Sequence, residues 1–235
     1  MKSFLILLFS VFGIHSFGQT IINDPNAEVR NTGSFSAIKA SDGIDIYLSQ
    51  GDDYALAVSA SDKKYIDYIK TEIKNGVLII SYDGRTFKYN NNRRLRAYIS
   101  FKDLESLEAS AASNYIISGT LITNSLRIKL SGASEIKGTI DIQNLQMDLR
   151  GASLVKVNGT VQNLKIEAGG ASDVKNYDLV VDNCVANLGG ASDVKITVNK
   201  SLIAKAGGAS TLYYKGNPEK KDVSSEGAST ISQKD

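Results

Sequence analysis

The sequence predicts an all-β fold: a right-handed parallel β-helix or β-solenoid of about 19-residue repeats, with an irregular N-terminal β cap. Two observations predict it. A small-residue triplet ending in Ala-Ser recurs seven times, and apolar and polar residues alternate on both sides of the copies. Because so short a repeat cannot enclose a core of its own, we expect successive copies to stack in parallel, about 4.8 Å apart.

The triplets are regularly spaced. The first is Ala111-Ala112-Ser113, and Gly-Ala-Ser follows at Gly132, Gly151, Gly170, Gly190, Gly208 and Gly227, with the Ala positions 21, 19, 19, 20, 18 and 19 residues apart. We expect the Gly on the inward side of a corner between sheets, where a residue without Cβ permits positive φ and close backbone approach. The Ser should also face inward and join a ladder of hydroxyls, whereas the Ala should face outward.

The segments between triplets alternate as half-buried strands do. Before a triplet the apolar positions are, for example, Leu126, Ile128 and Leu130, and in a later copy Cys184, Ala186 and Leu188. After each triplet an apolar residue such as Ile136 is usually followed by a turn such as Lys137-Gly138-Thr139 or Asn158-Gly159-Thr160. Each repeat should therefore hold two or three short strands, with Cys184 inside.

Residues 19–105 have more aromatic residues and less regular spacing, and we interpret them as a β cap that is continuous with the repeats of residues 106–235. Strands are expected at 44–48, 54–58, 77–82 and 96–101, a short helix at 62–70 after a Ser61 cap, and an exposed turn at 90–94. Residues 19–235 should form one domain. Near the C-terminus the inward positions become Lys221, Val223 and Ser225, which would blunt an exposed edge.

The first eighteen residues predict a secretory signal peptide, cleaved after Gly18. The apolar run is too short for a membrane span, so we expect an exported protein in the periplasm, on the outer-membrane surface or outside the cell. Removing Lys2 leaves a net charge of about +1 (27 − 1 − 25). The mature chain therefore has no bias towards polyanions, and nucleic acid is not an expected partner.

The residue inventory argues against catalysis. The only His lies in the predicted signal peptide, which excludes His-based triads and most zinc sites from the mature chain. Burial at an inward position should make Cys184 inert. We therefore predict no enzyme activity, no cofactor and no metal.

One surface site is proposed from the repeats. Asp173 and Asp193 occupy the same outward position of adjacent repeats, flanked by Lys175 and Lys195. These four residues could bind a partner, and the two acids could hold a cation or, with a third acid, serve acid-base chemistry, or the whole set could be a solvated charged face. The outward Ala column could likewise accept a glycan chain or a second copy, or be a tight corner.

The stretch from Phe35 to Ile46, followed by residues 75–80, resembles the head-GIN domain family, whose members are described as putative autotransporter adhesins. Gly43-Ile44-Asp45 stands where that family has Gly-Ile-Asn. The resemblance, which also includes the Gly-Ala-Ser repeats, implies an exported β-helical adhesin without catalytic residues. From the residues themselves, the motif predicts a strand entry, with Gly43 as the bend and Ile44 in the core.

Two functions follow as hypotheses. The first is an exported cell-envelope binding or structural protein that presents a rigid solenoid surface to an envelope protein or glycan, with self-association as a further possibility. The second is a carbohydrate-active enzyme or a glycan-binding protein that works along one sheet.

Overall fold

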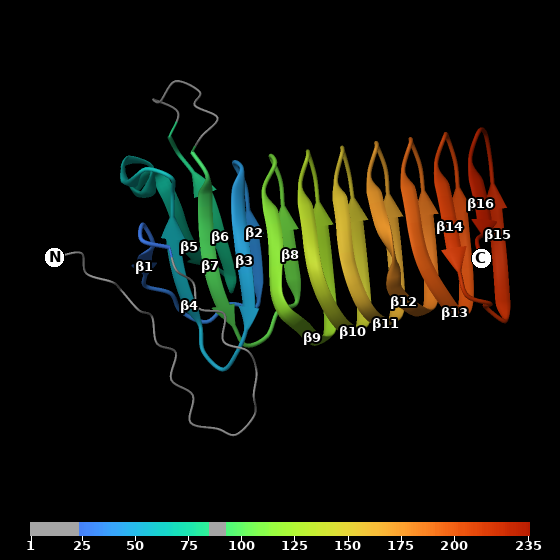
Figure 1. The fold of residues 1–235 in the computed structure, drawn as a ribbon, viewed down its shortest axis with the longest axis horizontal. Helices are drawn as coiled ribbons and strands as arrows, with labels where there is room; N and C mark the ends of the chain where they lie inside the picture. Colours follow the sequence, from blue (N-terminus) through green and yellow to red (C-terminus); the bar gives the residue numbers. More distant parts are fainter. Residues whose placement is uncertain (1–23, 85–92) are drawn as a thin grey trace.

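The computed structural model describes residues 24–84 and 93–235. The predicted signal peptide, its cleavage site and residues 90–92 of the expected turn lie outside the described residues. The described strands join into one continuous sheet that winds around an apolar core (Figure 1). The boundary expected between residues 105 and 106 stays a prediction.

The predicted β-solenoid is confirmed. Its central strands are β9 (Asn114–Leu130), β10 (Glu135–Leu149), β11 (Leu154–Ala168), β12 (Asp173–Leu188) and β13 (Asp193–Ala206). Neighbouring strands pair in parallel, with equivalent residues side by side, as in Leu145 with Leu164 and Leu164 with Cys184. The triplets connect one strand to the next along the upper edge of the solenoid in Figure 1.

Each long strand runs from one triplet to the next and bends once on the way, so the two short strands expected in each repeat form one bent strand. The expected turn at residues 137–139 is wrong. These residues stay within β10, and the pairing register with β9 shifts between Lys137 and Thr139 without a chain reversal. The same holds for residues 158–160, which stay within β11.

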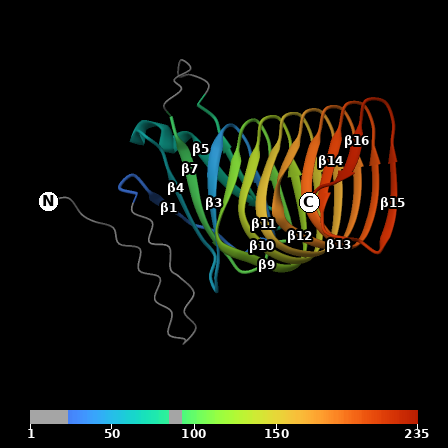
Figure 2. The ribbon, with the colours of Figure 1, turned by 45° about the vertical axis from the view of Figure 1, so that its right-hand side comes forward.

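The bends divide the solenoid into two facing walls, which Figure 2 shows as two rows of strands. The first wall contains β7 (Leu95–Phe101), β3 (Ile44–Gln50), the first halves of β9–β13, β14 (Thr211–Lys215) and β16 (Thr230–Gln233). The second contains β6 (Val77–Tyr82), β2 (Ala37–Ala40), β8 (Ser106–Ala109), the second halves of β9–β13 and β15 (Lys220–Ser225).

Alternate residues of both walls fill the space between them, as the sequence pattern predicts. Cys184 lies in this interior with 1% of its surface exposed, and burial raises the pKa of its thiol to about 12. It occupies the same column as Leu164 and Leu202. The inward position expected for Cys184 is therefore confirmed.

The triplet corners differ in part from expectation. The six triplet glycines have φ between +67° and +75°, which confirms the expected positive φ, but they are exposed and do not face inward. We call each turn of the solenoid a rung. A Cβ built at Gly170 would point along the solenoid axis and lie 2.5 Å from the carbonyl oxygen of Gly151 in the preceding rung. Stacked backbone, rather than inward side chains, therefore requires glycine at this position.

Six of the seven triplet serines are buried, as expected, and Ser229 in the last triplet is half-buried, but the serines form no ladder of hydroxyls. In the six Gly-Ala-Ser triplets the Ser Oγ donates a hydrogen bond within its own corner, to the carbonyl oxygen three residues earlier; Ser172 to Gly169, at 2.9 Å, is one example. The nearest acceptor for the hydroxyl is a carbonyl oxygen of its own corner, whereas the serine of the adjacent rung is about 4.8 Å away. The hydroxyl therefore bonds within the turn. The triplet alanines are exposed, as expected.

The N-terminal region stacks out of sequence order. The rung formed by β2 and β3 lies between the β8–β9 rung, which follows it along the chain, and the β6–β7 rung. Antiparallel strands cover this end: β1 (Glu28–Arg30) pairs with β4 (Ala55–Ser59), β4 with β7, and β5 (Ile69–Lys74) with β6. All four strands expected in this region are present.

The short helix expected near residues 62–70 is a 3₁₀ helix, η1 (Lys63–Tyr68). Its N-cap is Asp62 and not Ser61, because the Asp62 carboxylate accepts a hydrogen bond from the Lys64 amide at 3.1 Å. At the C-terminal end of the solenoid, Lys221 and Val223 occupy inward columns beside Leu202 and Ala204, but both are exposed because, among the described residues, β15 pairs only with β13 and no strand covers its other edge.

Candidate functional site

The four residues proposed from the repeats lie together on the outer face of the first wall. Asp173 pairs in register with Asp193, and Lys175 with Lys195. The Lys175 ammonium lies 2.7 Å from the Asp173 carboxylate, and the Lys195 ammonium 3.6 Å from that of Asp193. The hydrogen bond to Asp173, together with the negative charge of Asp173 and Asp193, raises the pKa of Lys175.

These lysines belong to a longer column. Its members are the outward residues of successive first-wall strands, in the order Tyr98, Tyr47, Ile116, Lys137, Lys156, Lys175, Lys195 and Tyr213. Lys156 is placed beside Lys175 because the residues directly before them, Val155 and Val174, are paired in register. We call this set the tyrosine–lysine column. One of its side chains projects from each rung, about every 4.8 Å.

Aromatic side chains lie at both ends of the column. The rings of Tyr47 and Tyr98 stack with their centroids 5.1 Å apart and an interplanar angle of 30°. Tyr98 also donates a 2.7 Å hydrogen bond to Asp24, and burial together with this bond raises the pKa of Tyr98. At the far end the Lys234 ammonium lies 4.2 Å from the centre of the Tyr213 ring.

The four lysines are not equally paired. Lys175 and Lys195 each have an acid in their own rung, and Lys156 reaches Glu135 of the neighbouring rung at 3.2 Å. Within residues 24–84 and 93–235, Lys137 makes no ion pair. Leu154 occupies the position of β11 that is Asp173 in β12. Cationic charge is therefore least compensated around Lys137 and Lys156, beside the tyrosines.

Sequence reasoning missed Lys137 and Lys156, although a signal was present. Four triplets are followed by any residue, then Ile or Val, then Lys, so the column could have been predicted by aligning the repeats. Tyr47 and Tyr98 carry no such signal. They come from the less regular N-terminal region and join the column only through the out-of-order pairing of β3 and β7.

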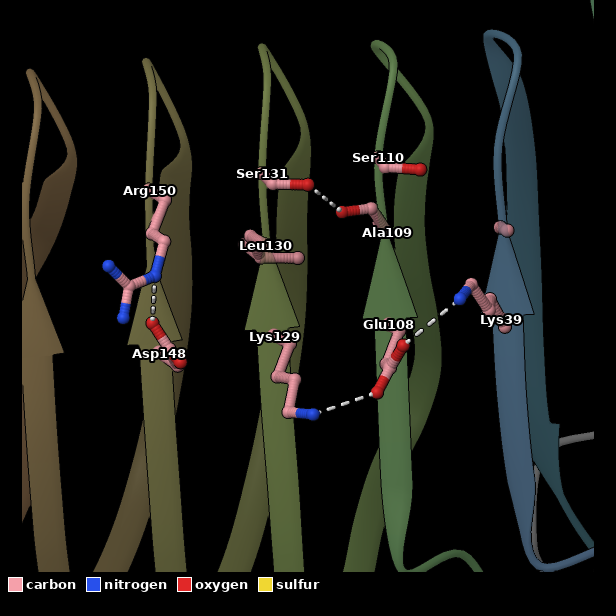
Figure 3. A pocket seen from close by; sticks show the side chains of 10 residues that line it. Lys39, Glu108, Ala109, Ser110, Lys129, Leu130, Ser131, Asp148 and Arg150 are labelled. Atoms are coloured by element: carbon pink, nitrogen blue, oxygen red, sulfur yellow. Dashed lines mark hydrogen bonds and ion pairs between the residues drawn. The ribbon is translucent and has the colours of Figure 1, made fainter.

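A second candidate is a shallow groove of about 220 Å³ on the second wall. Figure 3 shows the side chains that line it, which alternate in charge from strand to strand. The Glu108 carboxylate lies 3.1 Å from the Lys129 ammonium and 3.7 Å from that of Lys39, and Arg150 lies 3.0 Å from Asp148. Because these charges pair with one another, the groove offers a ligand less than the tyrosine–lysine column does.

The residues of the Gly43-Ile44-Asp45 motif build the corner next to the first triplet. Gly43 has φ +76° and begins the turn into β3, and Ile44 is fully buried. The Ser113 hydroxyl accepts hydrogen bonds from the amides of Gly43 and Ile44, both at 3.2 Å. Asp45 accepts a 2.8 Å bond from Asn114. These contacts connect the N-terminal region to the repeats, which is a structural role.

Residues 24–84 and 93–235 contain neither a cluster of metal-ligating side chains nor a membrane-spanning helix. No group of three or more His, Cys, Asp or Glu side chains there could hold a metal ion. None of the helical segments in residues 24–84 and 93–235 combines the length and apolarity that crossing a bilayer requires.

Comparison with known proteins identifies the family. Residues 34–218 match the family described as "Putative auto-transporter adhesin, head GIN domain". The chain belongs to this family. The resemblance of the Gly43 motif and the Gly-Ala-Ser repeats to the head-GIN domain is thereby confirmed. No curated protein matches the chain.

Several solved structures are similar to this head-GIN protein. The crystal structure of a putative adhesin from Bacteroides fragilis matches with a TM-score of 0.78 and 22% identity, covering 88% of this chain and 95% of that one. A putative lipid binding protein from Parabacteroides distasonis matches with a TM-score of 0.64 and 22% identity over 88% and 97%. A putative adhesin from Parabacteroides merdae matches at 0.63 and 17% over 89% and 95%. Structural similarity at 17–22% sequence identity establishes the fold.

Proposed function

We propose that this head-GIN protein is an exported, non-enzymatic adhesin of the cell envelope, which binds its partner on the outer face of the first wall. The observation that carries the proposal is the tyrosine–lysine column, in which three tyrosines, four lysines and Ile116, from eight strands, point outward in one line. A parallel solenoid holds such a column rigidly, because each rung is hydrogen bonded to both of its neighbours.

The acids beside the column support a binding role over a catalytic one. A carboxylate pair for sugar hydrolysis needs one group that holds its proton at neutral pH. Asp173 and Asp193 instead each form an ion pair with the lysine of their own rung, and a hydrolytic carboxylate pair would have to break both contacts. The carbohydrate-active enzyme is therefore the less supported hypothesis, whereas glycan binding gains support from the stacked, half-buried Tyr47 and Tyr98 on the outer face of the wall.

Localisation is tested with the full-length chain in a bacterial host. Export with cleavage after Gly18 predicts a mature N-terminus at Gln19, recovered outside the cytoplasm. Protease treatment of intact cells then separates a surface location, where the protein is degraded, from a periplasmic one, where it survives. Recovery of the uncleaved chain in the cytoplasm would contradict the proposal.

Binding is tested with purified residues 19–235 and envelope material divided into polysaccharide, protein and lipid fractions. We expect saturable binding to at least one fraction. Replacing Lys137 and Lys156 with Ser should reduce it, whereas replacing Lys165 and Lys205, which project from the second wall, should not. Both variants lose two positive charges. Absence of saturable binding to every fraction, or equal losses in the two variants, would contradict the proposal.

A further inference from the structure

We propose that the tyrosine–lysine column binds a linear polysaccharide that carries a carboxylate on each sugar unit, laid along the solenoid axis. This inference rests on the proposed binding function and names its ligand class. It starts from the geometry of the column, in which Lys137 and Lys156 are paired in register and the Tyr47–Tyr98 stack lies two rungs away from Lys137, across Ile116.

Spacing selects a linear polymer. Rungs of a parallel sheet repeat about every 4.8 Å, and one sugar unit is about as long as one rung is wide. A chain that lies along the axis therefore places about one sugar unit beside each rung, and brings several of its carboxylates within reach of the lysines. A compact ligand would contact one or two rungs only and would leave the rest of the column unused.

The mixture of side chains selects a sugar. Apolar C–H faces of sugar rings pack against aromatic rings, and the column offers the Tyr47–Tyr98 stack at one end and Tyr213 at the other. Ile116 continues the apolar surface between the tyrosines and Lys137. Carboxylates on the same chain would contact the ammonium groups of Lys137 and Lys156, where cationic charge is least compensated.

The flanking acids restrict the charge density that the column tolerates. In the four rungs that carry the lysines, the adjacent outward column contains Glu135, Asp173 and Asp193, with Leu154 in the remaining rung. Duplex DNA carries one negative charge per about 1.7 Å of axis and would be repelled by these acids. A polyuronate carries far fewer charges per length, and its hydroxyl groups can donate hydrogen bonds to the same carboxylates.

The test uses two hexasaccharides with the same β-1,4 linkage, oligomannuronate, which is charged, and cellohexaose, which is neutral. Calorimetric titration of residues 19–235 should detect binding of oligomannuronate that weakens as salt rises, and much weaker binding of cellohexaose. The double variant Lys137→Ser with Lys156→Ser should bind oligomannuronate about tenfold more weakly, as expected for the loss of two exposed ion pairs.

Two control variants make the result specific. Lys165→Ser with Lys205→Ser removes the same charge from the second wall and should change affinity by less than about twofold. Tyr47→Leu should weaken binding by about threefold without changing its salt dependence, because it removes a ring and not a charge. Circular dichroism melts of each variant establish that it is folded.

Three results would overturn the inference: equal affinity for both hexasaccharides, equal losses in the two lysine variants, or no binding of oligomannuronate at all. The last result is separable from failure of the proposed function. If envelope fractions still bind the wild-type chain and not the Lys137–Lys156 variant, the column is a binding surface for another ligand class. If no fraction binds either, both proposals fail.

Discussion

Gly170→Ala is the sharpest test of how the rungs stack. A Cβ at this position would lie 2.5 Å from the Gly151 carbonyl oxygen and 3.0 Å from the Gly151 amide nitrogen. These are backbone atoms, so they can move away only if the rungs separate. The positive φ of +75° adds about 1–2 kcal/mol for an L-residue, and overpacking adds about 1–3 kcal/mol. We therefore expect a loss of about 2–5 kcal/mol in unfolding free energy.

Neighbouring glycines separate the two contributions. Gly169 has an ordinary φ and open space around its Cβ direction, so Gly169→Ala should leave stability unchanged or raise it by up to about 1 kcal/mol. Gly43 has φ +76° with no atom within 4 Å, so Gly43→Ala should show the backbone strain alone, about 1–2 kcal/mol. Ala171→Ser, on the exposed side, should change stability by less than about 0.5 kcal/mol.

Urea unfolding followed by far-UV circular dichroism measures these differences. Because rungs of a solenoid can unfold separately, hydrogen exchange at the Ala171 and Ala191 amides provides a local reading. These amides donate to the carbonyls of Gly151 and Gly170, both at 2.7 Å, and separation of the rungs would weaken both bonds. If Gly169→Ala proved as damaging as Gly170→Ala, axial backbone contact would not be the reason for the triplet glycine.

Three further outcomes are expected. Cys184 should resist a thiol reagent at pH 8 until the protein is unfolded, because it is buried and its pKa is raised to about 12; rapid labelling of the native protein would show that the inward register is wrong. Burial acts to raise the pKa of Asp24, but hydrogen bonds, that from Tyr98 first, outweigh it and lower the pKa. Asp24 thus stabilises the fold above its unfolded pKa of about 3.9 and loses this effect as pH falls through the lower folded value. Asp24→Asn should cost about 1 kcal/mol at pH 7, and a difference from wild type that persists undiminished at pH 2 would refute the assignment. Tyr115→Phe should cost about 1 kcal/mol in urea unfolding, because the buried hydroxyl donates to the Glu108 carbonyl at 2.7 Å; a neutral substitution would mean that this bond contributes nothing.

Prediction from the sequence was most successful where the chain repeats. Seven triplets at nearly constant spacing define parallel rungs, and the alternation between them identifies the buried columns, including Cys184. It was less successful at the corners. Parity counting placed Gly170 inward because it assumes an extended chain, whereas residues 169–172 turn, and the missing Cβ of Gly170 would point along the axis instead.

The column of lysines in the candidate site is also encoded by the repeats of the sequence. Lys137, Lys156, Lys175 and Lys195 follow their triplets at one fixed offset, and a repeat register carries that offset directly into a column. Any parallel stacking of these repeats would align them. The sequence by itself therefore determined the solenoid, its interior and the cationic part of the proposed binding surface, because all three depend on contacts between equivalent positions of neighbouring repeats.

Only the tertiary structure decided how the N-terminal region stacks on the repeats. The β2–β3 rung is inserted between β6–β7 and β8–β9, so Tyr47 and Tyr98, which are 51 residues apart in the chain, stack on each other and extend the lysine column. No local pattern encodes this order. It depends on the shape that remains at the open end of the solenoid and on which strands can cover it, and these are properties of the packed core as a whole.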